Sequence, residues 1–103
     1  MSVDVRNNKL YIKMCGEIDH HMASILREES DNILNRSYIK EIVFDFEGIK
    51  FMDSSGIGLI MGRYRQVGYN NGEVSLINVP RNIDRMLEMS GIYGIIKNVE
   101  REN

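Results

Sequence analysis

EIVFDFEGIKFMDSSGIGLIMGRY, residues 41–64, predicts a buried strand, a short link and a helix in direct succession. Residues 41–46 are almost continuously apolar and rich in β-branched and aromatic side chains, as in a strand that is covered on both faces. We therefore expect a central parallel strand there and interpret residues 47–52 as the link. From about Ser54 to Val67, apolar residues return at helical spacing. The glycines of residues 68–72 suit the left-handed end of that helix.

The N-terminal third of the chain predicts a hairpin and a helix. Residues 2–6 and 9–14 alternate in polarity around two asparagines, a residue type that tolerates the positive φ of a tight turn. We expect an antiparallel hairpin with Leu10 and its alternating neighbours on one face. Asp19 is a candidate N-cap for an amphipathic helix that ends near Arg36.

The C-terminal part continues the alternation of strands and helices. Residues 73–79 and 94–99 predict two strands, with a helix between them that begins at Pro80 and ends at Gly91. The tail, residues 100–103, is expected to fray. The order ββαβαβαβ predicts an α/β fold and one domain over residues 1–103. Its mixed, mostly parallel sheet is opened by the N-terminal β-hairpin.

Composition excludes several classes of function. The chain has 103 residues, 43% of them hydrophobic and 27% charged, with a net charge of −2. Its lysines and arginines are scattered, so nucleic acid is not an expected partner. No apolar run approaches the length of a membrane span, and the N-terminus lacks the apolar core of a signal peptide. The single cysteine, Cys15, cannot form an internal disulfide and is expected to be buried; a cytoplasmic protein is indicated.

The turn Asp53-Ser54-Ser55-Gly56 lies at the carboxyl end of the predicted central strand, a favoured functional position in α/β folds. The simplest interpretation is a helix N-cap, in which a Ser or Asp oxygen accepts an unpaired backbone N–H for about 1 kcal/mol. A cap does not explain two serines beside an aspartate. Nor does it explain Gly56 and Gly58, since a glycine inside a helix costs roughly 1 kcal/mol relative to alanine. These glycines predict that another surface approaches the backbone closely.

A catalytic interpretation is weaker. Ser54 or Ser55 could act as a nucleophile with Asp53 and a histidine, His20 or His21, but there is no G-x-S-x-G elbow and no group to orient the histidines. Adjacent histidines also lack the spacing of metal ligands, so no metal or catalytic residue is expected.

A phosphoaspartate at Asp53, as in response regulators, is a further alternative. It needs an acidic metal pocket and a lysine near the end of a late strand. Glu17 and Asp19 follow the second strand, but Lys97 falls inside the last one. This interpretation therefore ranks below a modified serine.

A phosphate-accepting serine is another interpretation of the turn. The N–H groups and the dipole at a helix start favour an anion by typically 0.3–1 kcal/mol, so the fold tolerates a phosphate there. The added charge of about −1.5 to −2 would instead act on a docked partner. An unpaired charge at an interface costs several kcal/mol. A phosphate would thus turn a tight complex into a weak one.

Three segments carry a resemblance to a known family. GEIDHH (residues 16–21), FMDSSGIGLIMGRYRQ (residues 51–66) and RMLEMSGIYGIIK (residues 85–97) resemble the STAS-domain anti-sigma factor antagonists, in order and over essentially the whole chain. The D-S-S-G turn is specific to this superfamily. The double histidine and the G-R-Y lean towards the sporulation branch, since the general-stress branch usually differs at those histidines.

The resemblance implies a regulatory function without catalysis or a cofactor. Members bind an anti-sigma factor that is a serine kinase and so free the sigma factor it holds. The kinase phosphorylates the first serine of the turn, here Ser54, with ATP, and the phosphorylated form loses its partner until a phosphatase restores it. The docking surface implied by the family consists of Glu17, Asp19, Asp53, Ser55, Gly56 and Ile57. The alternatives are a STAS signalling module with another kinase, as in the general-stress response, and a small serine hydrolase.

Overall fold

The computed structural model describes residues 2–100, so the predicted frayed tail lies outside the described residues except for Glu100. Its strands form one sheet in the order β1 (Ser2–Arg6), β2 (Lys9–Ile18), β3 (Glu41–Met52), β4 (Glu73–Ile77) and β5 (Lys97–Asn98). β1 runs antiparallel to β2, and the other neighbouring pairs are parallel. The turn of the hairpin holds Asn7 and Asn8 at φ 52° and 64°. The mixed, mostly parallel sheet and its opening hairpin are confirmed.

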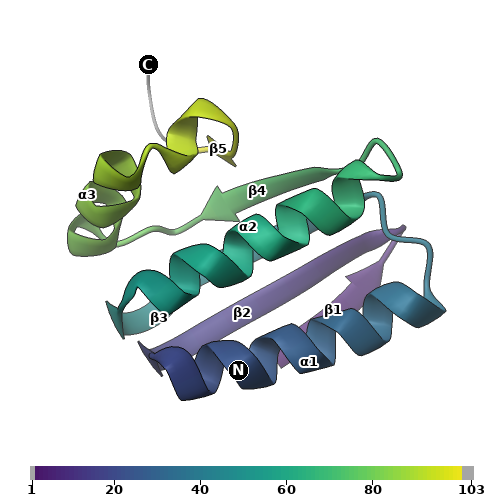
Figure 1. Ribbon diagram of the computed structural model, residues 1–103, viewed down its shortest axis with the longest axis horizontal. Helices are drawn as coiled ribbons and strands as arrows, with labels where there is room; N and C mark the ends of the chain where they lie inside the picture. The colour runs from purple at the N-terminus through teal and green to yellow at the C-terminus, as the bar shows by residue number, and fades with distance from the viewer. Residues whose placement is uncertain (1, 101–103) are drawn as a thin grey trace.

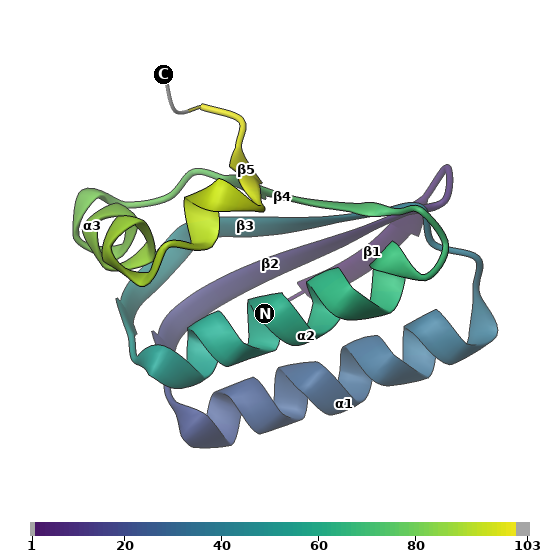
Figure 2. The same ribbon diagram turned by 45° about the horizontal axis from the view of Figure 1, so that its top comes forward.

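The helices follow the predicted order. α1 (His20–Arg36) and α2 (Ser54–Gly68) lie side by side over one face of the sheet, as Figures 1 and 2 show. α3 (Arg81–Ser90) lies beyond the carboxyl end of β4 and leads through the 3₁₀ turn η1 (Ile92–Gly94) to β5 (Figure 1). In this view β2, β3 and β4 run towards the left, and the ends of β2 and β3 lie there beside the starts of α1 and α2.

The core lies between the sheet and the helices. β2 contributes Leu10, Ile12, Met14 and Ile18, all at most 1% exposed, and β3 contributes Ile42, Phe44 and Phe46, all 0% exposed. The register pairs Leu10 with Ile42 and Ile12 with Phe44, so these residues share one face.

The opposite face corrects the prediction that β3 is apolar on both sides. Val43 is buried there, but Glu41, Asp45 and Glu47 alternate with the core residues. Lys9 pairs with Glu41 at 3.1 Å, and the hydrogen bond and charge of this carboxylate raise the pKa of Lys9. Lys13 pairs with Glu47 at 3.4 Å. The central position of β3 between two parallel neighbours is confirmed, while one of its faces is largely polar.

Residues 47–52, interpreted from sequence as a link, belong to β3. Two irregularities in the pairing of β2 with β3 mask the strand pattern of these residues in the sequence. The pairs Lys13–Asp45 and Cys15–Gly48 flank the first irregularity, and the pairs Gly16–Ile49 and Glu17–Phe51 flank the second. Each irregularity leaves one extra residue in β3, which is a β-bulge, and each resets which side chains face the core. The apolar alternation therefore breaks although the strand continues.

The prediction about the cysteine, which lies beside the first bulge, was wrong. Cys15 was expected to be buried, but it is exposed because the core position before it belongs to Met14. Gly48 lies opposite, where a Cβ would come within 2.9 Å of the Cys15 Cβ. The bulge thus needs a residue without a side chain beside the cysteine.

Several element ends differ from the predictions. β4 ends at Ile77 and not at 79, and the last strand covers only Lys97–Asn98 because η1 occupies the residues before it. Pro80 is the cap residue before α3 and not its first residue, whereas Gly91 ends α3 at φ 83°, as predicted. The left-handed residue after α2 is Asn71, at φ 58°, and not a glycine. Gly72 is needed for space: a Cβ there would lie 2.7 Å from the Lys40 carbonyl oxygen.

Candidate functional site

Two helix starts lie next to each other at the carboxyl edge of the sheet. Because β2 and β3 are parallel neighbours, Ile18 pairs with Met52, and the Asp53 N–H donates to the Ile18 carbonyl at 3.2 Å. This bond joins the loop before α1 to the loop before α2. The G-E-I-D and D-S-S-G segments thus lie side by side at this edge of the sheet.

Each helix is capped by an aspartate. The Asp19 carboxylate accepts the Met22 N–H at 2.9 Å, and the Asp53 carboxylate accepts the Ser55 N–H at 2.8 Å. The Gly56 N–H donates to the Asp53 carbonyl at 3.0 Å. The predicted cap at Asp19 is confirmed, and in the second turn the aspartate, not a serine, provides the capping oxygen.

The two serines of the turn differ in environment. Ser54 is the first residue of α2 and is exposed, and within residues 2–100 its hydroxyl makes no hydrogen bond. Ser55 is half-buried, and its backbone N–H is held by Asp53. An exposed hydroxyl that takes no part in the cap can be modified without removing a contact of the fold.

The glycines of the turn serve different purposes. Gly56 is buried, and a Cβ there would overlap with Sδ and Cγ of Met52, which is 1% exposed. The surface that approaches Gly56 closely is therefore the chain's own core, which corrects the prediction of an external one. At Gly58, which is exposed, a Cβ would meet nothing within 4 Å, so the fold itself does not demand a glycine there.

The other predicted docking residues lie around this edge. Glu17 and Asp19 are exposed, and Asp53 and Ile57 are half-buried at the start of α2. Of the six, Gly56 offers the least surface to a partner. His20 and His21 are exposed in the first turn of α1, and no His, Cys, Asp or Glu cluster suited to a metal ion occurs among the described residues. No bond joins either histidine to Ser54 in the described part of the chain, which leaves the hydrolase interpretation without geometric support.

Sequence comparison identifies the family. The family model described as the STAS domain matches residues 1–102. The chain belongs to the STAS-domain family of anti-sigma factor antagonists. It is 34% identical to an anti-sigma F factor antagonist of Paenibacillus polymyxa over 93 residues, which are 90% of this chain and 80% of that protein. It is 26% identical to an anti-sigma-B factor antagonist of Bacillus subtilis (strain 168) over 98 residues, 93% of this chain and 88% of that protein.

Solved structures agree with this assignment. The unphosphorylated form of the anti-sigma factor antagonist SpoIIAA matches with a TM-score of 0.85 at 27% identity, covering 96% of this chain and 88% of that one. The phosphorylated form of SpoIIAA, a Bacillus cell fate determinant, matches with a TM-score of 0.76 at 28% identity, covering 96% of this chain and 91% of that one. The STAS fold predicted from the sequence is thus confirmed.

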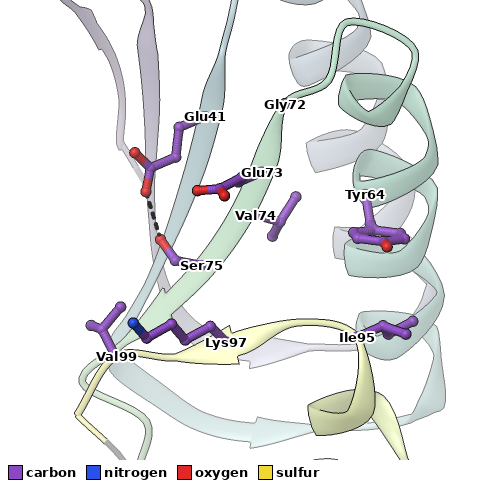
Figure 3. A pocket seen from close by; sticks show the side chains of 9 residues that line it. All are labelled: Glu41, Tyr64, Gly72, Glu73, Val74, Ser75, Ile95, Lys97 and Val99. Carbon is purple, nitrogen blue, oxygen red and sulfur yellow. Dashed lines mark hydrogen bonds between the residues drawn. The ribbon is translucent and has the colours of Figure 1, made fainter.

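The edge of the sheet that holds Asp19 and Ser54, called the serine edge below, is separate from a cavity of about 400 Å³. This cavity lies beside β4 and β5 and is shown in Figure 3. Tyr64 and Ile95 lie on one side of this cavity, and Glu41, Ser75 and Lys97 lie towards the sheet. A hydrogen bond of 3.0 Å joins Ser75 to Glu41, so part of the polar lining is already paired within the fold. None of the residues predicted for the switch lines this cavity.

Two features of the fold were missed by sequence reasoning. Arg63, in the G-R-Y segment, is 5% exposed and joins α2 to α1: it donates to the Ser30 hydroxyl at 2.8 Å and the Arg27 carbonyl at 3.1 Å, and pairs with Asp31 at 2.9 Å. Burial lowers its pKa. Phe51, two residues before Asp53, is 49% exposed. The burial of Arg63 could have been inferred from the sequence, because Arg63 has the helical spacing of the apolar face of α2.

Proposed function

We propose that this STAS domain is a phosphorylation switch that binds an anti-sigma factor serine kinase and thereby releases a sporulation sigma factor. The observation that carries the proposal is the Ser54 hydroxyl, which is exposed at the start of α2 and takes no part in the cap. Transfer of the γ-phosphoryl group of ATP to the Ser54 Oγ would release ADP and the hydroxyl proton. A phosphatase acting on the product would reset the switch.

Electrostatics at the edge support an effect on binding and not on folding. The start of α2 favours a phosphate, while the neighbouring Asp53 carboxylate repels it, so the two contributions oppose each other. In a complex, the phosphate would lie against the partner and lose its water. A penalty of about 3 kcal/mol for a desolvated, unpaired charge lowers affinity more than a hundredfold. Phosphorylation therefore turns binding off while the fold persists.

The docking surface is proposed to comprise Glu17, Asp19, Asp53, Ser55, Gly56 and Ile57, with Gly56 acting through the path of the backbone. These residues form no part of the described cavity beside β4, and a protein surface is a more suitable partner for such an edge than a small molecule. We accordingly propose a cytoplasmic regulator with no catalytic activity of its own. None of the helices in residues 2–100 is long and apolar enough to cross a membrane.

Identity to the named relatives favours the sporulation role. The chain is 34% identical to the antagonist of anti-sigma F and 26% identical to the antagonist of anti-sigma B. A STAS signalling module with a different kinase is the alternative, and the proteins captured with this chain from its native cells would distinguish the two.

The test uses two matched variants, Ser54→Ala and Ser55→Ala. We expect both to bind the anti-sigma factor kinase encoded in the same genome, because neither hydroxyl supports the cap. With labelled ATP, Ser55→Ala should take up phosphate and Ser54→Ala should not. Label retained on Ser54→Ala would refute the assignment of the acceptor, and failure of the unmodified wild-type protein to bind the kinase would refute the proposed function.

A further inference from the structure

Phe51 differs from the two other phenylalanines of the chain. Phe44 and Phe46 are 0% exposed in the core, whereas Phe51 is 49% exposed. In the register it pairs with Glu17, and it precedes Ser54 by three residues. A large aromatic side chain is thus left partly in water at the edge that holds the modifiable serine.

The second bulge of β3 produces this exposure. The pairing passes over Lys50, so that Phe51 faces Glu17 and Met52 faces Ile18. Met52 is 1% exposed and lies beneath Gly56, on the helix side of the sheet. Because neighbouring side chains of a strand point to opposite faces, Phe51 points away from the helices. β-Bulges re-aim side chains next to functional sites, and this one directs an aromatic ring outwards.

The position of Phe51 is fixed before any partner arrives. Its backbone belongs to β3, which pairs with β2 up to Met52, and the next backbone bond joins Asp53 to Ile18 at 3.2 Å. Because the backbone is already ordered, binding has to order only the Phe51 side chain. Exposed aromatic residues with such pre-organised positions provide much of the binding energy at protein interfaces.

We propose that Phe51 is the apolar anchor of the docking surface and enters an apolar pocket, surrounded by basic side chains, on the anti-sigma factor kinase. This inference rests on the proposed function for the identity of the occupant. The chemistry of the occupant follows from the surroundings: three carboxylates, of Glu17, Asp19 and Asp53, and one ammonium group, of Lys50, lie within three residues of Phe51 or of its cross-strand partner. The excess of negative charge requires a basic rim on the partner.

A second copy of this chain is a less suitable occupant. A symmetric dimer through this edge would bring the same carboxylates of two copies against each other, and like charges at an interface cost several kcal/mol. The charge of the edge therefore selects a different, basic protein.

Affinity for the kinase, measured by calorimetry with unphosphorylated protein, tests the anchor. We expect Phe51→Ala to weaken binding at least about tenfold, which corresponds to about 1.4 kcal/mol. Phe51→Leu, which keeps an apolar group, should recover most of the loss. The matched control is Tyr69→Ala, because Tyr69 is 87% exposed and lies in the loop between α2 and β4, at the other end of α2. We expect this control to change affinity less than about twofold.

A second measurement does not depend on truncation. The chain contains no tryptophan, so Phe51→Trp introduces a single reporter, and Tyr69→Trp provides the control. We expect the emission of the reporter at position 51 to shift to shorter wavelength when the kinase binds, and that at position 69 to stay unchanged. Circular dichroism of each variant alone confirms that it is folded.

The outcomes separate the two proposals. Wild-type affinity in Phe51→Ala, or an unshifted emission in the bound Phe51→Trp variant, would refute the role of Phe51 as the anchor. Neither result would contradict the proposed phosphorylation switch. Equal losses in Phe51→Ala and Tyr69→Ala would also refute the anchor, since the effect would not belong to this edge. If the unmodified wild-type protein fails to bind the kinase, the proposed function is refuted and the anchor with it.

Discussion

Two glycines of α2 predict opposite effects of the same substitution. At Gly56, an alanine Cβ would overlap with Sδ and Cγ of Met52, which is itself 1% exposed and enclosed by the core. At Gly58, two residues further on, an alanine Cβ would meet no atom within 4 Å. Gly56→Ala and Gly58→Ala therefore differ only in what the added methyl group contacts.

The magnitudes follow from two opposing terms. Replacing a glycine inside a helix by alanine gains roughly 1 kcal/mol of stability at either position. Gly58→Ala should keep this gain and raise the free energy of unfolding by about 0.5–1 kcal/mol. At Gly56, overpacking costs about 1–3 kcal/mol, because Met52 can move only by displacing its buried neighbours. Gly56→Ala should therefore lower the free energy of unfolding by up to about 2 kcal/mol, after the helical gain is subtracted.

Urea unfolding of both variants, followed by circular dichroism at 25 °C, measures these changes. The double variant Met52→Ala/Gly56→Ala provides a control for the cause. Met52→Ala alone creates a cavity, but in the double variant the new methyl group fills part of it, so the two costs should sum to more than the cost of the double variant. Equal stabilities of Gly56→Ala and Gly58→Ala would refute this reasoning, and strict additivity in the double variant would show that Met52 is not the obstacle.

Two further predictions concern polar groups away from the serine edge. Arg63→Met should leave the free energy of unfolding within about 1 kcal/mol of wild type, since an apolar side chain can replace a buried ionic contact at little cost. Asp31→Ala should lower it by about 1–3 kcal/mol, because the buried guanidinium loses its counter-charge; urea unfolding that ranks Arg63→Met below Asp31→Ala would contradict this account. Burial and the hydrogen bond to Asp84 raise the pKa of Tyr93 to about 12, from about 10 in an unfolded chain. Its contribution to stability is therefore complete below pH 10 and lost as the pH rises towards 12, and Tyr93→Phe should show a weaker decline of the unfolding free energy over that window.

The order of elements could be predicted from the sequence because local signals agree with the fold. Asn7-Asn8 suits a tight turn, Asp19 and Asp53 cap helices, and Gly91 takes a left-handed φ. Each of these signals depends on the backbone of a few neighbouring residues. Such features can be predicted from the sequence without knowledge of the tertiary structure.

The candidate site could be predicted from the sequence only in part. The side-by-side arrangement of the loops at Ile18 and Asp53 requires that β2 and β3 are parallel neighbours, and the sequence order left that pairing open. The separate roles of Gly56 and Gly58 did not follow, because only the packed structure shows that Met52 lies beneath the first of them.

What could not be predicted depends on contacts between distant residues. The two bulges of β3 arise from its pairing with β2, so the residues from Glu47 to Met52 break the alternation of a strand while remaining part of one. Arg63 is buried because Ser30, Asp31 and the Arg27 carbonyl of α1 meet it across the helix pair. The bulges interrupt the strand period, and the helical spacing of Arg63 shows only that it faces inwards, not which residues of α1 it meets.

The paired bulges also constrain how relatives of this protein can be aligned through residues 47–50. Each bulge adds one residue to β3 relative to β2, and together they add two, which restores the alternation of faces at Met52. Loss of a single residue there would exchange the inward and outward positions just before the turn, placing an aromatic ring under α2 and a methionine in water. Insertions and deletions in this segment should therefore occur in pairs, and a one-residue gap in an alignment here marks either a misalignment or a different arrangement of the strand.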